Sequence, residues 1–301
     1  SGSYLQNNGN FLNQGIELTL GWTDKTGDFN YSFNTNFTYN KNEVKELLEG
    51  TLGLFGGNLP VGGFFSTYTI VGEPIGSYYG RNVVGIFQNE DDINNYTWTN
   101  PETNEEVLIQ PNAKPGDFKY EDVDNNGLID AKDRVFLGSA LPTYLFGFNA
   151  TLEYKGVDFS VDIYAQGGNK IYNAKRAQRL GNENYDLDFY ENRWTGEGST
   201  NEYPSADLTA DNMLPNSWYI EPGGFVRIRN IQVGYSIPEK MVTKLGIRSV
   251  RFYVNTSNPF TFFKYNGFSP EIASSSPTSQ GIDLNVYPMS ATYNFGVNVN
   301  F

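Results

Sequence analysis

The sequence predicts an all-β fold, the C-terminal strands of a transmembrane antiparallel β-barrel with long loops on one side of the membrane. Apolar and polar residues alternate over seven long runs, which is the period of a strand with two different faces. The runs last about 9 to 13 residues, whereas strands of globular proteins have about 5 or 6 and tilted membrane-spanning strands about 9 to 11. Short and long connections alternate, as periplasmic turns and extracellular loops do in outer-membrane barrels.

The composition excludes several classes of protein. The 301 residues include 34 acidic and 21 basic side chains, a formal charge of −13, and contain neither His nor Cys. Disulfides, thiolate metal sites and His-based catalytic triads are therefore excluded. A net charge this negative argues against an extended basic face for nucleic-acid phosphates, so we expect no nucleic-acid partner. No run approaches 18 apolar residues, the length that a transmembrane helix needs.

The alternation is clearest in the last predicted strand, where from Thr292 onward every second residue is apolar and those between are Thr, Asn or Gly. Its apolar face holds Tyr293, Phe295, Val297, Val299 and Phe301. The run at 225–236 is the least regular of the seven. The predicted strands are 14–23, 29–40, 143–154, 157–167, 225–236, 249–258 and 289–301.

The connections orient the predicted barrel. The three long ones, 41–142, 168–224 and 259–288, all fall at the same end of the strands, so we expect them to be extracellular and the C-terminus to be periplasmic. Bacterial barrels normally have an even number of strands, and an open sheet edge cannot face lipid. Seven strands therefore predict the C-terminal part of a larger barrel, with the earlier strands outside residues 1–301.

Several short motifs, taken in order, resemble one family. They are NQGIEL at 13–18, VGEPIGSYYG at 71–80, GIF at 85–87, PGDFKY at 115–120, FVRIRNI at 225–231 with Gly234 and Tyr235, NPFT at 258–261, and the closing Phe301. Together they resemble the C-terminal region of the SusC/RagA family of TonB-linked outer-membrane transporters of Bacteroidota, over nearly the whole chain.

The resemblance implies a barrel of about 22 strands around a plug. It also implies a Gram-negative outer membrane, a SusD-like lipoprotein lid, energy supplied through TonB, and import of oligosaccharides or oligopeptides. Two transporter–lipoprotein pairs could assemble as a dimer. Phe301, at the end of an aromatic-rich strand, resembles the signal that barrel-assembly machinery recognises, and we interpret it as that signal. The alternative is one more aromatic residue at the lipid boundary.

Residues 122–133 match an EF-hand loop, in which oxygen ligands stand at positions 1, 3, 5, 7, 9 and 12 and Gly at position 6. Gly127 takes position 6, and position 12 holds Asp where Glu is usual. The alternative is an Asp- and Asn-rich turn of a surface loop. The predicted ligands of a structural Ca²⁺ are Asp122, Asp124, Asn126, Leu128 through its carbonyl, Asp130 and Asp133.

Two rival interpretations stay open. One is a soluble calcium-binding, β-rich adhesin or binding module, and the other is a secreted glycoside hydrolase. Acidic pairs such as Asp186 and Asp188 could suggest a hydrolase, but nothing fixes their separation, so we predict no catalytic residues. The basic cluster from Lys170 to Arg179 could contact the lid or lipopolysaccharide. Loop aromatics, Trp218 and Tyr265 among them, could stack on sugars or pack against each other.

Overall fold

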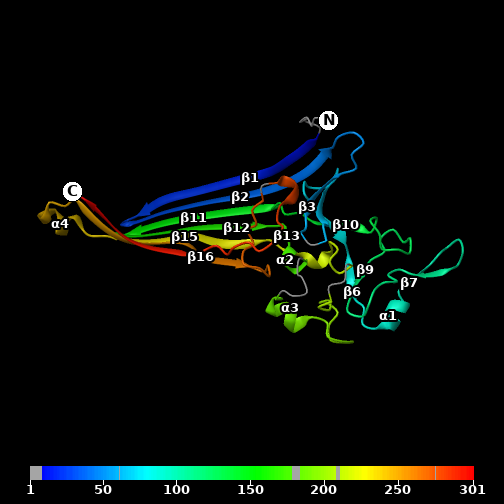
Figure 1. The fold of residues 1–301 in the computed structure, drawn as a ribbon. Helices are drawn as coiled ribbons and strands as arrows, with labels where there is room; N and C mark the ends of the chain where they lie inside the picture. The colour runs from blue at the N-terminus through cyan, green and yellow to red at the C-terminus, as the bar shows by residue number, and fades with distance from the viewer. Residues whose placement is uncertain (1–8, 61, 178–183, 208–210, 275) are drawn as a thin grey trace, which may run out of the picture.

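The computed structural model describes residues 9–60, 62–177, 184–207, 211–274 and 276–301. A long curved sheet forms one half of the molecule, and the long connections gather at one end of it (Figure 1). Among the described residues, none of the helices is long and apolar enough to cross a bilayer. The prediction of an all-β fold is confirmed, since helices account for only a few short segments.

The main sheet has seven antiparallel strands that are neighbours in the order in which they occur in the chain. Each overlaps one of the predicted ranges. The strands are β1 (Asn10–Thr26), β2 (Phe29–Glu46), β11 (Tyr144–Tyr154), β12 (Val157–Gly167), β15 (Phe225–Ser236), β16 (Ser249–Phe263) and β17 (Thr292–Asn300). Two of the turns that join them have only two residues, Gly27-Asp28 and Lys155-Gly156, with positive φ at Gly27, Lys155 and Gly156.

Several strands differ in length from the predicted ones. β1, β2 and β16 are longer than 14–23, 29–40 and 249–258, whereas β17 starts at Thr292 rather than at 289. The pairing of β1 with β2 continues to Asn10 opposite Glu46, past the last apolar residues of the alternating pattern. Backbone hydrogen bonds hold these ends, and they do not require alternating side chains.

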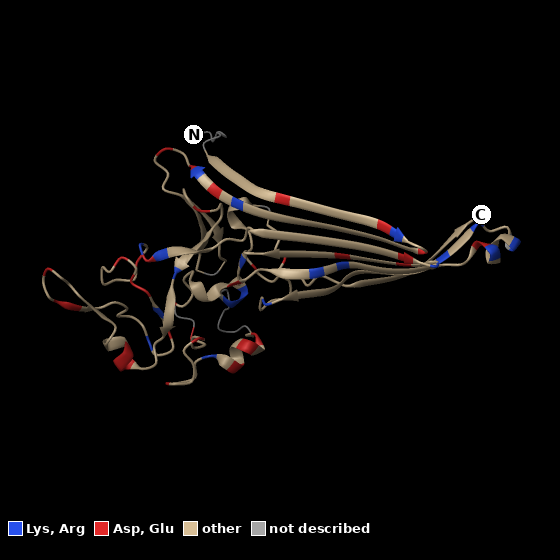
Figure 2. Cartoon of the chain, turned by 180° about the vertical axis from the view of Figure 1, so that it is seen from behind, with Lys and Arg blue, Asp and Glu red and all other residues tan. Residues whose placement is uncertain are grey.

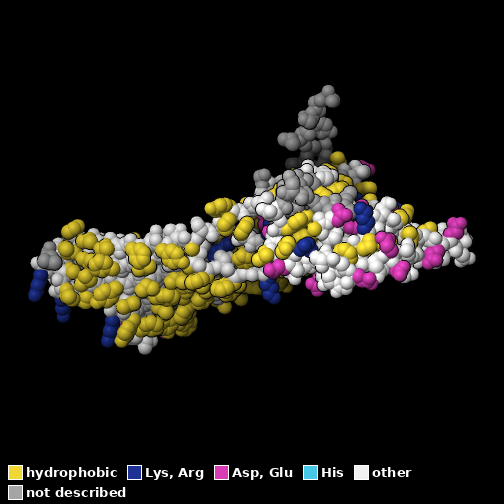
Figure 3. Space-filling view, turned by 60° about the horizontal axis from the view of Figure 1, so that its bottom comes forward, with side chains coloured by type: hydrophobic (Ala, Val, Ile, Leu, Met, Phe, Trp, Pro, Cys, Tyr) yellow, Lys and Arg dark blue, Asp and Glu magenta, His cyan; other side chains and the backbone are white. Residues whose placement is uncertain are grey.

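The two faces of the main sheet differ as the alternation predicts. One face, which we call the apolar face, leaves large hydrophobic side chains exposed on every strand; Ile16 is 69% and Phe295 is 80% exposed. Figure 3 shows these side chains as a nearly continuous yellow surface. The opposite, polar face holds Asn, Ser, Thr and charged residues. An exposed apolar surface of this extent marks a membrane or protein interface.

The irregular run at 225–236 contains a β-bulge. The register of β15 shifts between Ile228 and Asn230 against β16, and between Asp162 and Ile163 against β12. Arg229 is the extra residue, so the parity of the strand changes there. Odd-numbered residues point to the polar face before the bulge and even-numbered ones after it, which is why simple alternation fails in this strand.

The first long connection, predicted as the loop 41–142, is a folded unit. A four-stranded sheet in the order β10-β5-β4-β3 and two smaller strand pairs occupy it. Its elements are β3 (Leu54–Asn58), β4 (Phe65–Thr69), β5 (Tyr78–Arg81), β6 (Val83–Ile86), α1 (Glu90–Asn94), β7 (Thr97–Thr99), β8 (Glu106–Leu108), β9 (Phe118–Tyr120) and β10 (Arg134–Gly138). These elements have only three to five residues each, too few to show a period.

The other connections contain shorter elements. The second long connection holds β13 (Lys170–Tyr172), α2 (Ala174–Ala177), α3 (Leu187–Asn192), the 3₁₀ helix η1 (Ser217–Tyr219) and β14 (Ile220–Pro222). The third holds η3 (Pro277–Ser279). The connection between β15 and β16 holds α4 (Glu239–Val242) and η2 (Thr243–Leu245) at the opposite end of the sheet.

The three long connections share one hydrophobic core, so we call them together the loop body. Tyr78 donates a hydrogen bond to the carbonyl of Gly281 at 2.8 Å and so joins the first connection to the third. Gly281 has φ +68°, and a Cβ there would stand 2.1 Å from the Tyr78 hydroxyl, so glycine is required. The buried core residues are Leu59, Tyr78, Ile86, Phe118, Tyr120, Tyr172, Ala174 and Tyr219, with Ile282 packed against them.

Four core tyrosines make the loop body sensitive to alkali. Burial raises the pKa of Tyr78, Tyr120, Tyr172 and Tyr219 above the ordinary value of about 10. Below pH 10 both the folded and the unfolded states keep these protons. Above it only the unfolded state releases them, so stability falls as pH rises, by up to about 1.4 kcal/mol per pH unit for each tyrosine.

We therefore expect tyrosinate absorbance to rise in two steps, exposed tyrosines first and the core tyrosines together as the loop body opens. Tyr172→Phe should make the second step less steep, because it removes one titrating group whose hydroxyl has no hydrogen-bond partner among the described residues. Tyr287→Phe, at an exposed position, is the control. A single smooth titration of every tyrosine near pH 10 would contradict the prediction.

Candidate functional site

The acidic loop 122–133 lies between β9 and β10, and three of its predicted ligands converge. Carboxylate oxygens of Asp122, Asp124 and Asp133 lie within 4.8 Å of one another. Asp133 is fully buried, and its oxygens accept hydrogen bonds from the backbone N–H groups of Val123 at 2.9 Å and Asp130 at 2.6 Å. Positions 1, 3 and 12 of the motif therefore meet at one point.

The other three predicted ligands are engaged in the turn itself. Asn126 accepts a hydrogen bond from the N–H of Leu128 and donates to Asp124. The Asp130 carboxylate accepts from the N–H of Lys132, whose ammonium lies 4.0 Å from Asp124. Gly127 has φ +83°, as position 6 requires, and a Cβ there would meet Trp98 at 2.7 Å. The backbone thus follows the sharp turn of the motif, and Lys132 places a positive charge beside one of the converging carboxylates, Asp124.

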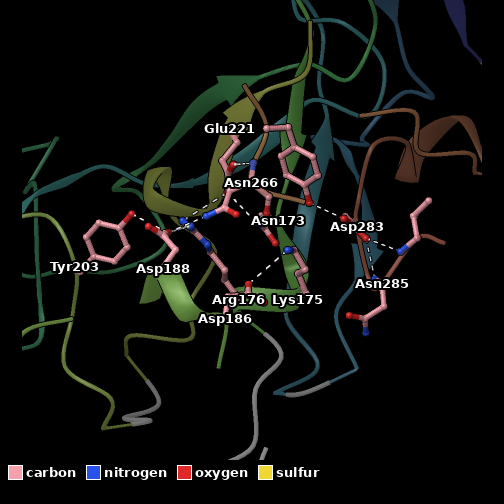
Figure 4. Close-up of polar contacts among 12 residues, drawn as sticks. Asn173, Lys175, Arg176, Asp186, Asp188, Tyr203, Glu221, Asn266, Asp283 and Asn285 are labelled. Atoms are coloured by element: carbon pink, nitrogen blue, oxygen red, sulfur yellow. Dashed lines mark hydrogen bonds and ion pairs between the residues drawn. The ribbon is translucent and has the colours of Figure 1, made fainter. Parts of the chain in front are cut away.

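A second polar cluster joins the second and third long connections (Figure 4). Arg176 of α2, with only 9% of its side chain exposed, pairs with Asp188 at 2.7 Å and with Glu221 at 3.5 Å. Lys175, 6% exposed, pairs with Asp186 at 3.4 Å. Buried charges are stable only when they are paired and hydrogen-bonded, so these contacts fix α2 against α3 and β14.

The same carboxylates hold the third connection. Asn266 donates its backbone N–H to Glu221 and its side-chain amide to Asp188, both at 2.7 Å. Close by, Tyr265 donates to Asp283 at 2.6 Å. Burial, followed by this hydrogen bond to a carboxylate, raises the pKa of Tyr265. We call Lys175, Arg176, Asp186, Asp188, Glu221 and Asn266 the latch cluster.

The latch cluster bears on two questions that the sequence left open. Lys175 and Arg176 of the predicted basic cluster are internal, so neither can reach a lid or a lipopolysaccharide phosphate; Lys170 is exposed, and Arg179 lies outside the described residues. Asp186 and Asp188 have structural partners of their own. The guanidinium of Arg176 also lies 4.9 Å from the ring centre of Trp218, so this aromatic residue packs inside the loop body. Sequence spacing gave no signal for these pairings.

The polar face of the main sheet carries ion pairs between strands. Arg229, the bulge residue, donates hydrogen bonds to Asp162: its Nη2 lies 2.9 Å from one carboxylate oxygen and 3.2 Å from the other. Arg251 pairs with Asp158 at 2.5 Å, beside a hollow of about 870 Å³ near the short turns. Phe301, at the end of this region on the apolar side, is 80% exposed. The pairings depend on strand register, which the sequence alone does not give.

Comparisons with known proteins agree with this architecture. No family model matches the chain. The chain is 31% identical, over 99% of its length, to TonB-dependent receptor P3 of Formosa agariphila and covers 30% of that protein. It is 27% identical, over 98% of its length, to TonB-dependent receptor SusC of Bacteroides thetaiotaomicron and covers 27% of it. The chain thus spans less than a third of the length of these curated relatives.

Among solved structures, the RagAB peptide transporter superposes with a TM-score of 0.71 at 22% identity. The superposition covers 98% of this chain and 30% of the other. A structure of the RagAB peptide importer in its closed–closed state gives 0.69 at 23% identity. The fold class expected from the sequence is confirmed by these structures.

The latch cluster generates a stability prediction. Arg176→Ala leaves Glu221, whose side chain is only 12% exposed, without its cation, and removing one partner of a buried pair typically costs about 3–5 kcal/mol. We expect faster amide hydrogen exchange in α2, α3 and β14 of the loop body. Lys114→Ala is the control, because its pair with Asp207 is exposed and exposed pairs contribute about 1 kcal/mol or less. Equal exchange in the two variants would contradict a role for the cluster.

Proposed function

We propose, on the premise that the chain belongs to the SusC/RagA type of TonB-dependent transporters, that it forms wall strands and surface loops of an outer-membrane importer of nutrients. In this proposal the apolar face contacts lipid and the polar face lines the lumen. The long connections are extracellular, and the short turns and Phe301 are periplasmic. The whole protein would do transport rather than chemistry, so we assign no catalytic residues.

The exposed apolar face supports this proposal most directly. It extends over all seven strands and carries large exposed side chains such as Leu20, Phe146 and Phe295. A soluble adhesin or hydrolase would have to cover this surface with another layer. Because β1 and β17 each leave one edge unpaired among the described residues, a wall embedded in lipid also requires further strands to pair with them.

The partners and the substrate belong to the same proposal. RagAB is named as a peptide transporter, and its name joins two components. We propose that the loop body contacts a SusD-like lipoprotein, that TonB acts through a region outside these residues, and that the cargo is an oligosaccharide or an oligopeptide. We propose further that two transporter–lipoprotein pairs associate as a dimer, which purification from the outer membrane would reveal.

Uptake by the native bacterium tests the proposed function. Deleting the gene should abolish growth on one class of nutrient, either oligosaccharide or oligopeptide, when each is the limiting nutrient. Growth should return with the intact gene but not when the TonB system is disabled. Purification from the outer membrane should require detergent and should recover a lipoprotein together with the transporter. Protein that is soluble without detergent would favour the adhesin, and unchanged uptake of both nutrients would oppose the import proposal.

We also propose that the acidic loop 122–133 binds a structural Ca²⁺. The convergence of Asp122, Asp124 and Asp133, together with the positive φ of Gly127, supports it. Asp133 is shorter than the usual Glu and already accepts two backbone hydrogen bonds, so we expect binding weaker than in a typical EF-hand. The cation would replace Lys132 as the charge that balances these carboxylates.

Limited proteolysis tests the calcium proposal. Cleavage within 122–133 should be slower in Ca²⁺ than in chelator, because the ion would hold the turn closed. Asp124→Asn should remove the difference, since it neutralises one of the converging carboxylates. Asp91→Asn in α1, also exposed and acidic, should keep it. Equal cleavage of the wild type in calcium and in chelator would oppose the proposal.

A further inference from the structure

The connection between β15 and β16 carries positive charge in a chain whose formal charge is −13. Residues 237–248 contain one acidic residue, Glu239, and three basic ones, Lys240, Lys244 and Arg248, all of them exposed. Figure 2 shows this basic segment around α4, at the far end of the sheet from the acidic loop body. The segment is much longer than the two-residue turns at 27–28 and 155–156.

None of the three cations has an acidic partner among the described residues, whereas Lys155 in the neighbouring turn pairs with Asp28 at 3.9 Å. Lys240 and Lys244 are four residues apart across α4 and η2, a spacing at which like charges on one helical face repel each other. Glu239 is explained by its place in the first turn of α4, where a negative charge is favourable. The cations are therefore left to interact with something outside the chain.

An exposed apolar side chain stands between the lysines. Met241 is 67% exposed, whereas its neighbour Val242 is buried and secures the segment. The segment starts two residues after Tyr235 and ends four residues before Phe252, two exposed members of the apolar face. Figure 3 shows Lys and Arg side chains at this end of the yellow surface, with Asp and Glu gathered at the other. Basic and apolar groups are thus combined where the apolar face ends.

We propose that residues 237–248 bind anionic phospholipid headgroups at the membrane surface where the short turns emerge, with Met241 inserted at the boundary of the acyl chains. This inference rests on the proposed function, because it requires the apolar face to be embedded in lipid. Long basic side chains near the end of a membrane-spanning element reach the interface, and anionic headgroups attract them. The segment would fix the height of this side of the wall in the bilayer.

Native mass spectrometry of the full-length transporter tests the inference, with phosphatidylglycerol and phosphatidylcholine offered in equal amounts. Lys240→Gln/Lys244→Gln should bind phosphatidylglycerol roughly 30-fold more weakly than the wild type, from about fivefold for each charge. Lys114→Gln/Lys264→Gln removes two exposed cations from the loop half of the chain and should leave binding unchanged. Glutamine keeps the helix propensity of lysine, so α4 should persist.

Three results would overturn the inference. The first is equal binding of phosphatidylglycerol and phosphatidylcholine by an assembled wild-type barrel. The second is equal binding of phosphatidylglycerol by the α4 double variant and the control double variant. If the α4 variant lost uptake but kept its lipid, the segment would serve a periplasmic protein instead. None of these three results contradicts the proposed import function of the wild-type protein. A wild-type protein that needs no detergent would overturn the proposed function and this inference together.

Discussion

The pairing of every backbone N–H and C=O with a neighbouring strand is the constraint on which the main sheet depends. Lipid offers no hydrogen-bond partners, so a wall exposed to it can consist only of long, uninterrupted strands whose neighbours are fully paired. The register of β11 with β2 and β12 meets this requirement along the whole of β11, from Tyr144 to Tyr154. Irregular pairing is found at the end of β1, where the register shifts between Asn10 and Phe11, and at the bulge residue Arg229, whose side chain pairs with Asp162.

The loop body is stabilised in a different way. It buries polar and charged groups, and each needs its own partner, because an unpaired charge in such a place is costly. Arg176 binds two carboxylates, and Tyr78 bonds to a backbone carbonyl of another connection. Such contacts are specific in direction and in distance. They therefore hold the three long connections, which are far apart in the sequence, in one relative arrangement. Apolar packing alone would specify that arrangement less uniquely.

The sequence predicts those features of the fold and of the candidate site that depend on neighbouring residues, and misses those that depend on contacts between distant parts of the chain. Strands such as β12 are visible because alternation is local, while the extension of β2 to Glu46 depends on pairing with β1. The short strands of the loop body carry no period, and their order requires tertiary contacts. Lys175 and Arg176 resemble surface cations in sequence because most charges are exposed. The acidic loop is the exception: its motif is local, and three of its six predicted ligands do meet.

The contacts between wall and loop body bear on how an importer of this kind could open. The end of β2 hydrogen-bonds to the VGEPIG motif, with Val44 and Gly72 bonded through their backbones at 2.9 Å and the Asn42 side chain accepting from Ile75 at 2.8 Å. On the other side, Arg227 of β15 pairs with Glu271 of the third connection. The loop body is thus attached to the wall at two separated strands and has a continuous core of its own. A unit attached at two separated strands moves together with the wall and does not rotate about a single attachment point. In the proposed importer, the moving part would accordingly be the lipoprotein or the plug, with the loop body as the fixed surface against which it closes.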